Sequence, residues 1–304
     1  MSVVFGLILA FAPVLSIAAV PLVPIPIAYV SRRHGLLVGV LASIGTGAIC
    51  FLLSDPFSAL LVFLLAALVG IGAGAALGRG IGRQWLLFAV SGLFLTAFVA
   101  WGAAALASAG MTPVDAVNSL TDQVVQAVQQ SPALLGGQDW LGQLRDTMSM
   151  IPYLLPALLM VAAMGFAAVM IYMSRRFFMR MGLDFPEGGS FKDLRVHFSL
   201  AYAMIAGLVC YLVSPHIADA YSSAVYLIGV NLLIISQTLF FVQALSIAHF
   251  FLSRLKASRV RSVIVYICLG LLQVTLSLPS WLGLFDIWLD YRRRFTSRIK
   301  PSQN

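Results

Sequence analysis

Charged residues are scarce in this chain of 304 residues, at 10% of the sequence, while hydrophobic residues make up 61%. Soluble domains typically carry about 25% charged residues. So few charges exclude a water-soluble globular protein and indicate that lipid surrounds most of the chain. The net charge of +8 would suggest nucleic acid in a soluble protein. Here the basic residues lie at the ends of apolar segments, so we expect membrane lipids as partners and no nucleic acid.

Residue patterns for catalysis or metal binding are also lacking. The chain has no H-E-x-x-H and no G-x-S-x-G motif, and its four histidines lie in four different regions. It has no Walker P-loop, so it cannot energise transport with ATP by itself. The three cysteines lie in separate apolar segments, which gives no disulfide framework. We therefore expect no enzyme activity, no catalytic residues, no metal site and no cofactor.

Long apolar runs are what the sequence has instead. A helix needs about 20 apolar residues to cross a bilayer core, and only a helix satisfies its own backbone hydrogen bonds there. The clear runs are 36–53, 57–77, 84–108, 150–174, 196–214, 222–252 and 262–279. The sequence therefore predicts an all-α, polytopic bundle of transmembrane helices, one membrane domain over 1–304 with about eight to ten membrane segments.

Both ends of the chain are apolar but interrupted by proline. Residues 3–30 contain four prolines, and this run is either one kinked crossing or two short ones that meet near Ser16. Residues 262–291 pose the same question at Pro279. We expect short, proline-broken segments at both ends.

The basic residues predict an orientation. All Lys and Arg residues except Arg145 fall into clusters at the ends of apolar runs, and the stretches between alternate clusters carry acids. The clusters are Arg32–Arg33, Arg79–Arg83, Arg175–Arg195, Arg254–Arg261 and Arg292–Lys300. Because Lys and Arg remain on the cytoplasmic side, we expect both termini in the cytoplasm and a cytoplasmic basic tail at 292–304. A single crossing at the end would place the last cluster outside, which favours a hairpin at Pro279, although 280–291 is too short for a full span.

Residues 110–148 form an acidic insert between two apolar runs. Residues 112–115 have the Thr-Pro-Val-Asp pattern of a capping box, and apolar residues then recur at helical spacing up to about Gln130. A short second helix is expected around Trp140. We predict an extracytoplasmic, amphipathic helical insert that acts either as a lid or as a plain connector.

Glycines recur at intervals of four residues near the end of one apolar run. Residues 70–75 match the loose dinucleotide-binding pattern G-x-G-x-x-A, but no strand precedes them and no acid follows at about 20 residues. A register of four makes a side-chain-free helix face, which favours close helix packing over nucleotide binding. The register comprises Gly70, Gly74, Gly78 and Gly82.

Polar residues inside the apolar runs are the candidates for a ligand site. Polar groups in lipid need partners, so Asn231, Gln237 and Gln243 either line a ligand pocket or bond neighbouring helices, at about 0.6 kcal/mol each. Asp286 and Asp290 share a helix face and could bind a cation or a proton. The alternative for these acids is ion pairing with the arginines that follow them.

Two stretches resemble a known family. They are Pro21-Leu-Val-Pro-Ile-Pro-Ile-Ala-Tyr-Val-Ser-Arg-Arg-His-Gly35 and Leu282-Gly-Leu-Phe-Asp-Ile-Trp-Leu-Asp-Tyr-Arg-Arg-Arg294. Both resemble the uncharacterised YybS-like family of bacterial integral membrane proteins, in which a proline-rich short helix precedes an Arg–His–Gly turn and a Gly-x-x-Asp…Asp-x-Arg motif closes the chain. The motif positions here are Pro24, Pro26, Arg33, His34, Gly35, Asp286, Asp290 and Arg293.

That family is similar in turn to the substrate-binding S components of energy-coupling-factor vitamin transporters. The resemblance implies a subunit of the bacterial inner membrane that binds or helps to move a small molecule, with a separate ATPase or other membrane protein as its partner. S components typically have six helices and this chain has more, and none of their vitamin-contacting residues is recognisable in it. The alternative function is a non-transporting scaffold or assembly factor for cell-envelope proteins, which would use the Gly70–Gly82 face and the basic loops.

Overall fold

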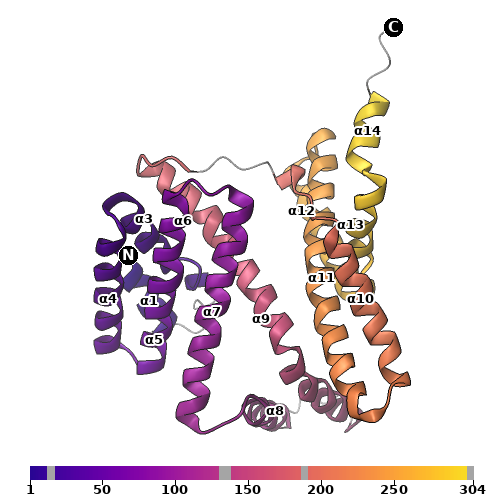
Figure 1. Ribbon diagram of the computed structural model, residues 1–304, viewed down its shortest axis with the longest axis horizontal. Coiled ribbons are helices and arrows are strands. Elements are labelled where there is room, and N and C mark those ends of the chain that lie inside the picture. Colours follow the sequence, from indigo (N-terminus) through magenta and orange to yellow (C-terminus); the bar gives the residue numbers. More distant parts are fainter. Residues whose placement is uncertain (12–17, 130–137, 186–190, 300–304) are drawn as a thin grey trace. The chain divides into compact units, whose positions relative to one another are not determined.

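The protein is helical in every part of the chain that the structure describes. The computed structural model describes residues 1–11, 18–129, 138–185 and 191–299. Seven of the helices in these ranges are long and apolar enough to span a membrane, which confirms the predicted all-α polytopic bundle. The chain forms two compact units, unit 1 over Met1–Gly188 and unit 2 over Gly189–Asn304 (Figure 1).

Unit 1 consists of helices that begin and end at recognisable residues. Asp55 caps one of them by accepting hydrogen bonds from the backbone N–H groups of Phe57 and Ser58, and Gly110 ends another in the left-handed conformation. The elements are α1 (Ser2–Phe11), α3 (Pro24–His34), α4 (Leu36–Leu53), α5 (Pro56–Leu64), the π-helix η1 (Leu65–Ile71), α6 (Gly72–Gly78), α7 (Arg83–Ala109), α8 (Pro113–Gln129) and α9 (Gln138–Arg180).

The short helix α3 lies at the centre of unit 1. It packs against α4, η1, α6 and α9, and its first half is almost fully buried, with Val23 and Ala28 both 0% exposed. In its described residues, the proline-rich start of the chain therefore contains the short helices α1 and α3. Neither reaches the length of about 20 residues that a single crossing needs. The predicted meeting point at Ser16 lies outside the described residues.

Two glycines of the predicted register lie where α3 approaches most closely. A Cβ atom at Gly70 would lie 2.8 Å from a side-chain carbon of α3, and one at Gly74 would lie 2.7 Å from a backbone oxygen of α3. Such an approach is possible only without a side chain. A Cβ at Gly78 or Gly82 would meet nothing within 4 Å among the described residues, because α6 ends at Gly78 and the helical register stops there.

The insert contains the predicted amphipathic helix, α8, with its capping box. The backbone N–H and the hydroxyl of Thr112 both donate to the Asp115 carboxylate, at 3.0 and 2.6 Å. These bonds hold the pKa of Asp115 below its ordinary value. The short second helix expected around Trp140 is wrong as a separate element, because it forms the first turns of α9, which continues through Pro152 and Pro156. Membrane helices tolerate such prolines where neighbouring groups satisfy the freed backbone.

Most charges of the described part of unit 1 separate by end, the exceptions being Asp184 just after α9 and Arg145 in the first turns of α9. The clusters Arg32–Arg33, Arg79–Arg83 and Arg175–Arg180 lie at one end of the unit, where α3, α6 and α9 finish (Figure 1). Asp55 and α8, which carries Asp115, lie at the opposite end. This is the separation that a membrane-spanning unit with one cytoplasmic end requires.

Unit 2 begins with a strap, which we define as residues 191–196, and continues as packed helices. Its elements are the 3₁₀ turn η3 (Phe191–Asp193), α10 (Ser199–Val213), the 3₁₀ turn η4 (Ser214–His216), α11 (Asp219–Arg254), α12 (Arg259–Leu276), α13 (Leu278–Leu289) and α14 (Tyr291–Ile299).

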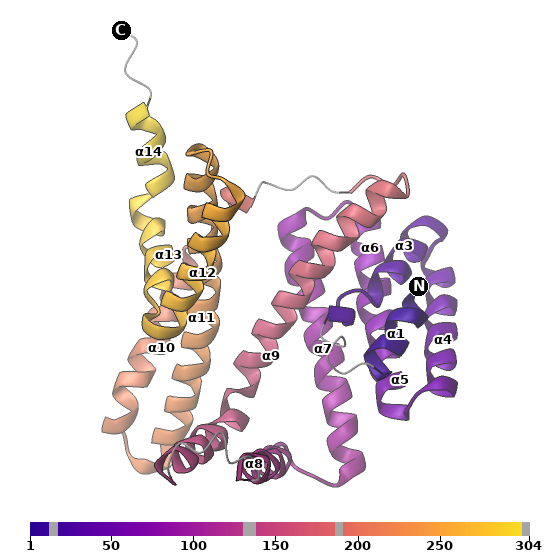
Figure 2. The same cartoon turned by 180° about the vertical axis from the view of Figure 1, so that it is seen from behind.

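The end of unit 2 has the predicted hairpin, with its break at Ser277. This residue adopts the left-handed conformation, with φ of 54°, between α12 and α13. Residues after the break contact residues of α11 that lie 43 or 44 positions earlier in the chain. The pairs are Ser280 with Gln237, Gly283 with Phe240, Asp286 with Gln243 and Phe295 with Phe251. A constant offset means that α13 and α14 run parallel to α11, so the chain reverses twice and α14 lies at the end where α11 finishes (Figure 2).

The contact between α13 and α11 depends on Gly283. A Cβ atom there would lie 2.0 Å from the carbonyl oxygen of Phe240, which is backbone and cannot move aside. Gly283→Ala should therefore destabilise the protein by about 3 kcal/mol through overpacking, measured by thermal unfolding of the purified chain in detergent. Gly270→Ala is the matched control, because its Cβ meets nothing within 4 Å. It should change stability by about 1 kcal/mol or less, and an equal loss in both variants would contradict the assigned contact.

Candidate functional site

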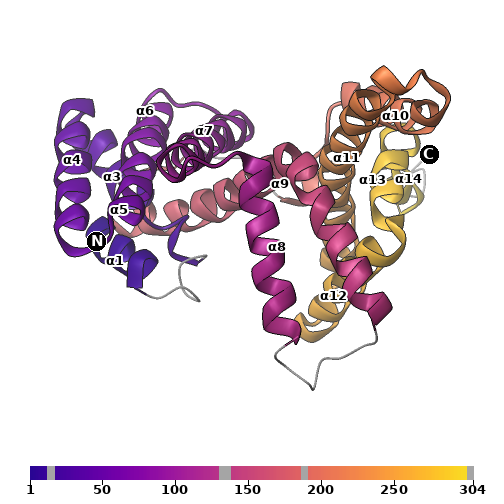
Figure 3. The same ribbon diagram turned by 90° about the horizontal axis from the view of Figure 1, so that it is seen from below.

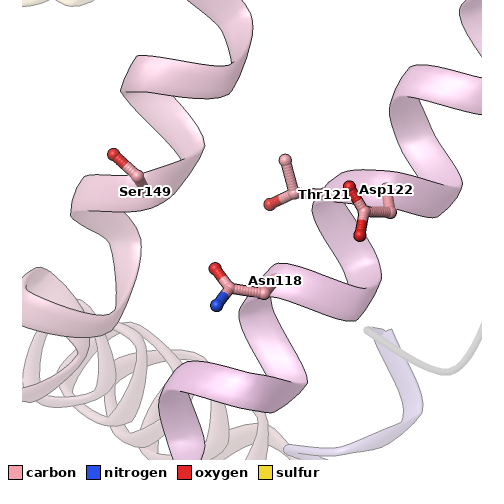
Figure 4. Close-up of a pocket in the computed structure, with 4 residues that line it drawn as sticks. All are labelled: Asn118, Thr121, Asp122 and Ser149. Carbon is pink, nitrogen blue, oxygen red and sulfur yellow. The ribbon is translucent and has the colours of Figure 1, made fainter.

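A polar cleft lies between α8 and the first part of α9. Its volume is about 310 Å³, and it is lined by Asn118, Thr121, Asp122 and Ser149 (Figure 4). Ligand sites for small molecules occupy about 300–1,000 Å³, so the α8–α9 cleft has room for a small solute. The sequence does not predict this cleft, because its lining residues on α8 and on α9 lie about 30 positions apart and meet only when α8 packs on α9.

The amphipathic pattern of α8 produces this cleft. Val117, Thr121 and Val125 recur at intervals of four, and all three are buried. Figure 3 shows α8 beside the first part of α9, the helix against which it packs. Asn118 and Asp122 lie one residue further round α8 and are exposed. Docking the apolar stripe therefore leaves a polar edge of α8 facing the gap to α9.

The cleft offers hydrogen-bond acceptors more than donors. The Thr121 hydroxyl donates to the carbonyl oxygen of Val117 at 2.8 Å, and the Ser149 hydroxyl donates to the carbonyl oxygen of Asp146 at 2.7 Å. Each hydroxyl has used its single proton, so its oxygen can only accept. Asp122 adds a carboxylate, and no basic side chain is among the lining residues that the structure describes. This chemistry suits a small molecule that carries hydroxyl or ammonium groups.

The three residues proposed for a pocket in 222–252 lie elsewhere. Gln243 is 1% exposed, and its amide is held on both sides: it donates to Asp286 at 3.2 Å and accepts from the backbone N–H of Val196 at 2.9 Å. The Asn231 side chain donates to the carbonyl oxygen of Leu227 in its own helix. Gln237 contributes its backbone oxygen to Ser280. Of these side chains, that of Gln243 bonds other elements of unit 2, and none of the three residues lines the α8–α9 cleft.

Asp286 forms a buried ion pair with Arg292. The two side chains are 3.3 Å apart, with 3% and 5% of their surfaces exposed. The Asp286 carboxylate also accepts from Gln243 and from the backbone N–H of Tyr291 at 3.0 Å. Of the two possibilities for Asp286, a cation or proton site and an ion pair with a following arginine, the structure has the ion pair. Protein donors occupy both carboxylate oxygens.

The pairing differs from that expected for one continuous helix. Asp290 adopts the left-handed conformation, with φ of 40°, and ends α13. This turn brings Arg292 back toward Asp286, six residues earlier, and leaves Arg293 exposed. The motif arginine at the ion pair is thus Arg292 and not Arg293. Asp290 itself pairs with Arg195 through two bonds of 3.0 and 3.1 Å.

The same residues clamp the strap onto the helices. Arg292 donates to the carbonyl oxygens of Lys192 and Leu194, and Ser246 donates to that of Phe191 at 2.6 Å. Burial raises the pKa of Asp290, but the hydrogen bonds from the Arg195 guanidinium and the Arg293 backbone N–H, together with the charges of both arginines, hold that pKa below its ordinary value. We call Asp286, Arg292, Gln243 and Ser246 the polar clamp. Its two charges are paired with each other, so its role is to hold the strap and the helices together.

The motif near the start of the chain builds the corner between α3 and α4. Pro24 is the first residue of α3, where a missing N–H costs nothing, and Pro26 follows within the first turn. Arg33 donates to the Tyr29 hydroxyl, while His34 is exposed. Gly35 has φ of 95° and makes the turn into α4.

Metal ligands do not gather in the described ranges, where no three His, Cys, Asp or Glu side chains lie close enough to hold an ion.

The buried pair Asp286–Arg292 and the more exposed pair Asp290–Arg195 should contribute differently to the free energy of unfolding. Arg292→Met leaves Asp286 buried without its cation, which should destabilise the protein by about 3–5 kcal/mol. Arg195→Gln removes a partner of Asp290 in a pair whose side chains are 57% and 29% exposed, and should cost about 1 kcal/mol or less. Thermal unfolding of both purified variants tests this, and equal losses would show that the buried pair has no special weight.

One family model matches this chain, and it covers residues 1–287. The matched range includes the α8–α9 cleft, the α3–α4 corner and Asp286, and it ends before Arg292. No curated protein matches the chain, and no solved structure matches it. The model is described as "Predicted membrane protein (DUF2232)". Because the match extends over nearly the whole sequence, the chain belongs to the DUF2232 family of membrane proteins.

Proposed function

We propose that the protein is a membrane subunit that binds a small polar molecule at the α8–α9 cleft and helps to move it across the bacterial inner membrane. This role is that of the S components, to which the YybS-like family, resembled by residues 21–35 and 282–294, is similar in turn. The energy would come from a separate ATPase, since the chain has no P-loop. The observation that carries the proposal is the cleft of about 310 Å³ with its excess of acceptors.

The position of α8 supports access from water. Leu120 and Val124 are exposed on the apolar side of α8, 54% and 39% respectively, as expected of a helix that lies in the membrane interface. Asn118 and Asp122 face the polar side. A solute could therefore reach the cleft without crossing the hydrocarbon layer, and it would be captured on the extracytoplasmic side.

The scaffold alternative is weakened by the packing of unit 1. It relied on the Gly70–Gly82 face to hold partner proteins. Gly70 and Gly74 already pack against α3 within the unit, so this part of the face has no room for a partner helix.

Filling the cleft should abolish ligand binding. Asn118→Trp adds a large ring to the lining, whereas Gln123→Trp adds the same ring about 140° further round α8. We expect a small molecule to be extracted reproducibly from the gently purified wild-type protein, and to be reduced at least about tenfold in Asn118→Trp through steric exclusion. Mass spectrometry of the extracts and of co-purifying proteins is the measurement.

Gln123→Trp is the matched control and should retain the molecule. If wild-type protein yields no recurrent metabolite and only cell-envelope proteins co-purify, the binding proposal is wrong and the scaffold is favoured. A recurrent ATPase partner would support transport.

Orientation has a separate test. Cys50, Cys210 and Cys268 are first replaced, and single cysteines are then introduced as Ser297→Cys or Gln123→Cys. With both termini cytoplasmic and the insert outside, a membrane-impermeant maleimide should label Gln123→Cys in intact cells and Ser297→Cys only after permeabilisation. Labelling of Ser297→Cys in intact cells would refute a cytoplasmic tail at 292–304.

A further inference from the structure

Three segments that are far apart in the sequence gather their basic residues at one end of unit 2. They are the strap, the loop between α11 and α12 (residues 255–258), and α14. Arg292 holds the strap by donating to Lys192, and the Phe251 and Phe295 rings, 5.0 Å apart, join the end of α11 to α14. Figure 2 shows α14 beside the junction of α11 and α12.

The side chains at this end form an exposed basic surface. We define the basic surface as Lys192, Lys256, Arg259 and Arg293, all of which are exposed. Further exposed basic residues flank it: Arg254, Arg261 and Arg294.

Acids do not balance this charge. Asp193 and Asp290 lie at the same end, and Asp290 is already paired with Arg195. Residues 214–222, at the other end of unit 2, contain no Lys or Arg. Positive charge is therefore in excess at one end of unit 2 alone.

The basic surface lies at the level of lipid headgroups. Lys256 and Arg259 flank the junction of α11 and α12, both of which are long and apolar enough to span a membrane. Trp288, the last residue but one of α13, is 49% exposed, and tryptophan concentrates at the membrane–water interface. The positive charges lie just beyond this point, where the phosphates of a bilayer lie.

We propose that the basic surface is a binding site for the phosphate groups of anionic phospholipids. The headgroup would be contacted by Lys256 and Arg259 from one side and by Arg293 from the other. Arg293, the exposed motif residue, takes no part in the polar clamp, and lipid binding gives it a role. Each basic residue at an anionic membrane surface strengthens the attraction about fivefold. The site is independent of the α8–α9 cleft.

Nucleic acid is the competing polyanion, and the structure favours lipid. Single-stranded nucleic acid is held by aromatic rings on which bases stack. Two rings beside residues of the basic surface, Phe295 and Phe191, are packed edge-on against Phe251 and His249 instead. A surface bounded by membrane-spanning helices also meets lipid phosphates at far higher local concentration.

The test compares lipid binding by native mass spectrometry. The full chain is delipidated in a neutral detergent and titrated with phosphatidylglycerol or with phosphatidylcholine of the same acyl chains. Wild-type protein should bind phosphatidylglycerol at least about tenfold more tightly. The variant Lys256→Gln/Arg259→Gln/Arg293→Gln should lose most of this preference, since these side chains are exposed and their replacement leaves packing intact.

A control with the same change of charge uses unit 1. Arg175→Gln/Arg176→Gln/Arg180→Gln alters three exposed residues at the end of α9 and should keep the phosphatidylglycerol preference. Equal losses in both triple variants would show bulk charge and not a site, and no preference in wild-type protein would also overturn the proposal. RNA that co-purifies with wild-type protein but not with the unit 2 variant, with unchanged lipid binding, would assign the surface to nucleic acid.

Discussion

A polar group without a partner costs several kcal/mol in lipid, and this constraint organises the whole molecule. It makes every described element helical, since a helix satisfies its own backbone. It also explains the polar clamp. Asp286 and Arg292 are both almost fully buried, and burial is tolerable because strap carbonyl oxygens bond Arg292 and the Gln243 amide bonds Asp286. Gln243 and Asp286, two of the residues that first suggested a ligand or ion site, are in mutual contact for this reason.

Helix packing meets the same constraint in a different way. Lipid tails are as apolar as leucine, so helices associate through close van der Waals contact and not through exclusion of water. Glycine supplies that contact in both units, at Gly70 and Gly74 against α3 and at Gly283 against α11. Gly207 and Gly229 do the same between α10 and α11, where an added Cβ would lie 3.1 Å or less from backbone atoms.

The sequence predicts the spans well because apolar length is a local property. The run 36–53 is reproduced as α4, and 84–108 agrees with α7 to within a residue at each end. Tertiary pairings are not local. The partner of Asp286 depends on a left-handed turn at Asp290, a conformation that few non-glycine residues adopt. The α8–α9 cleft depends on docking, although the buried stripe of α8 beside its polar edge was a readable sign of it.

The polar clamp joins the beginning of unit 2 to its end. The strap enters the unit at residues 191–196, and the arginine that holds it comes about 100 residues later. The strap and most of the helices are therefore synthesised before the arginine that holds them together. During synthesis, the strap carbonyl oxygens of Lys192 and Leu194 gain their partner only when Arg292 emerges. The emergence of Arg292, and not the insertion of any one earlier helix, is therefore the event that holds the strap in place.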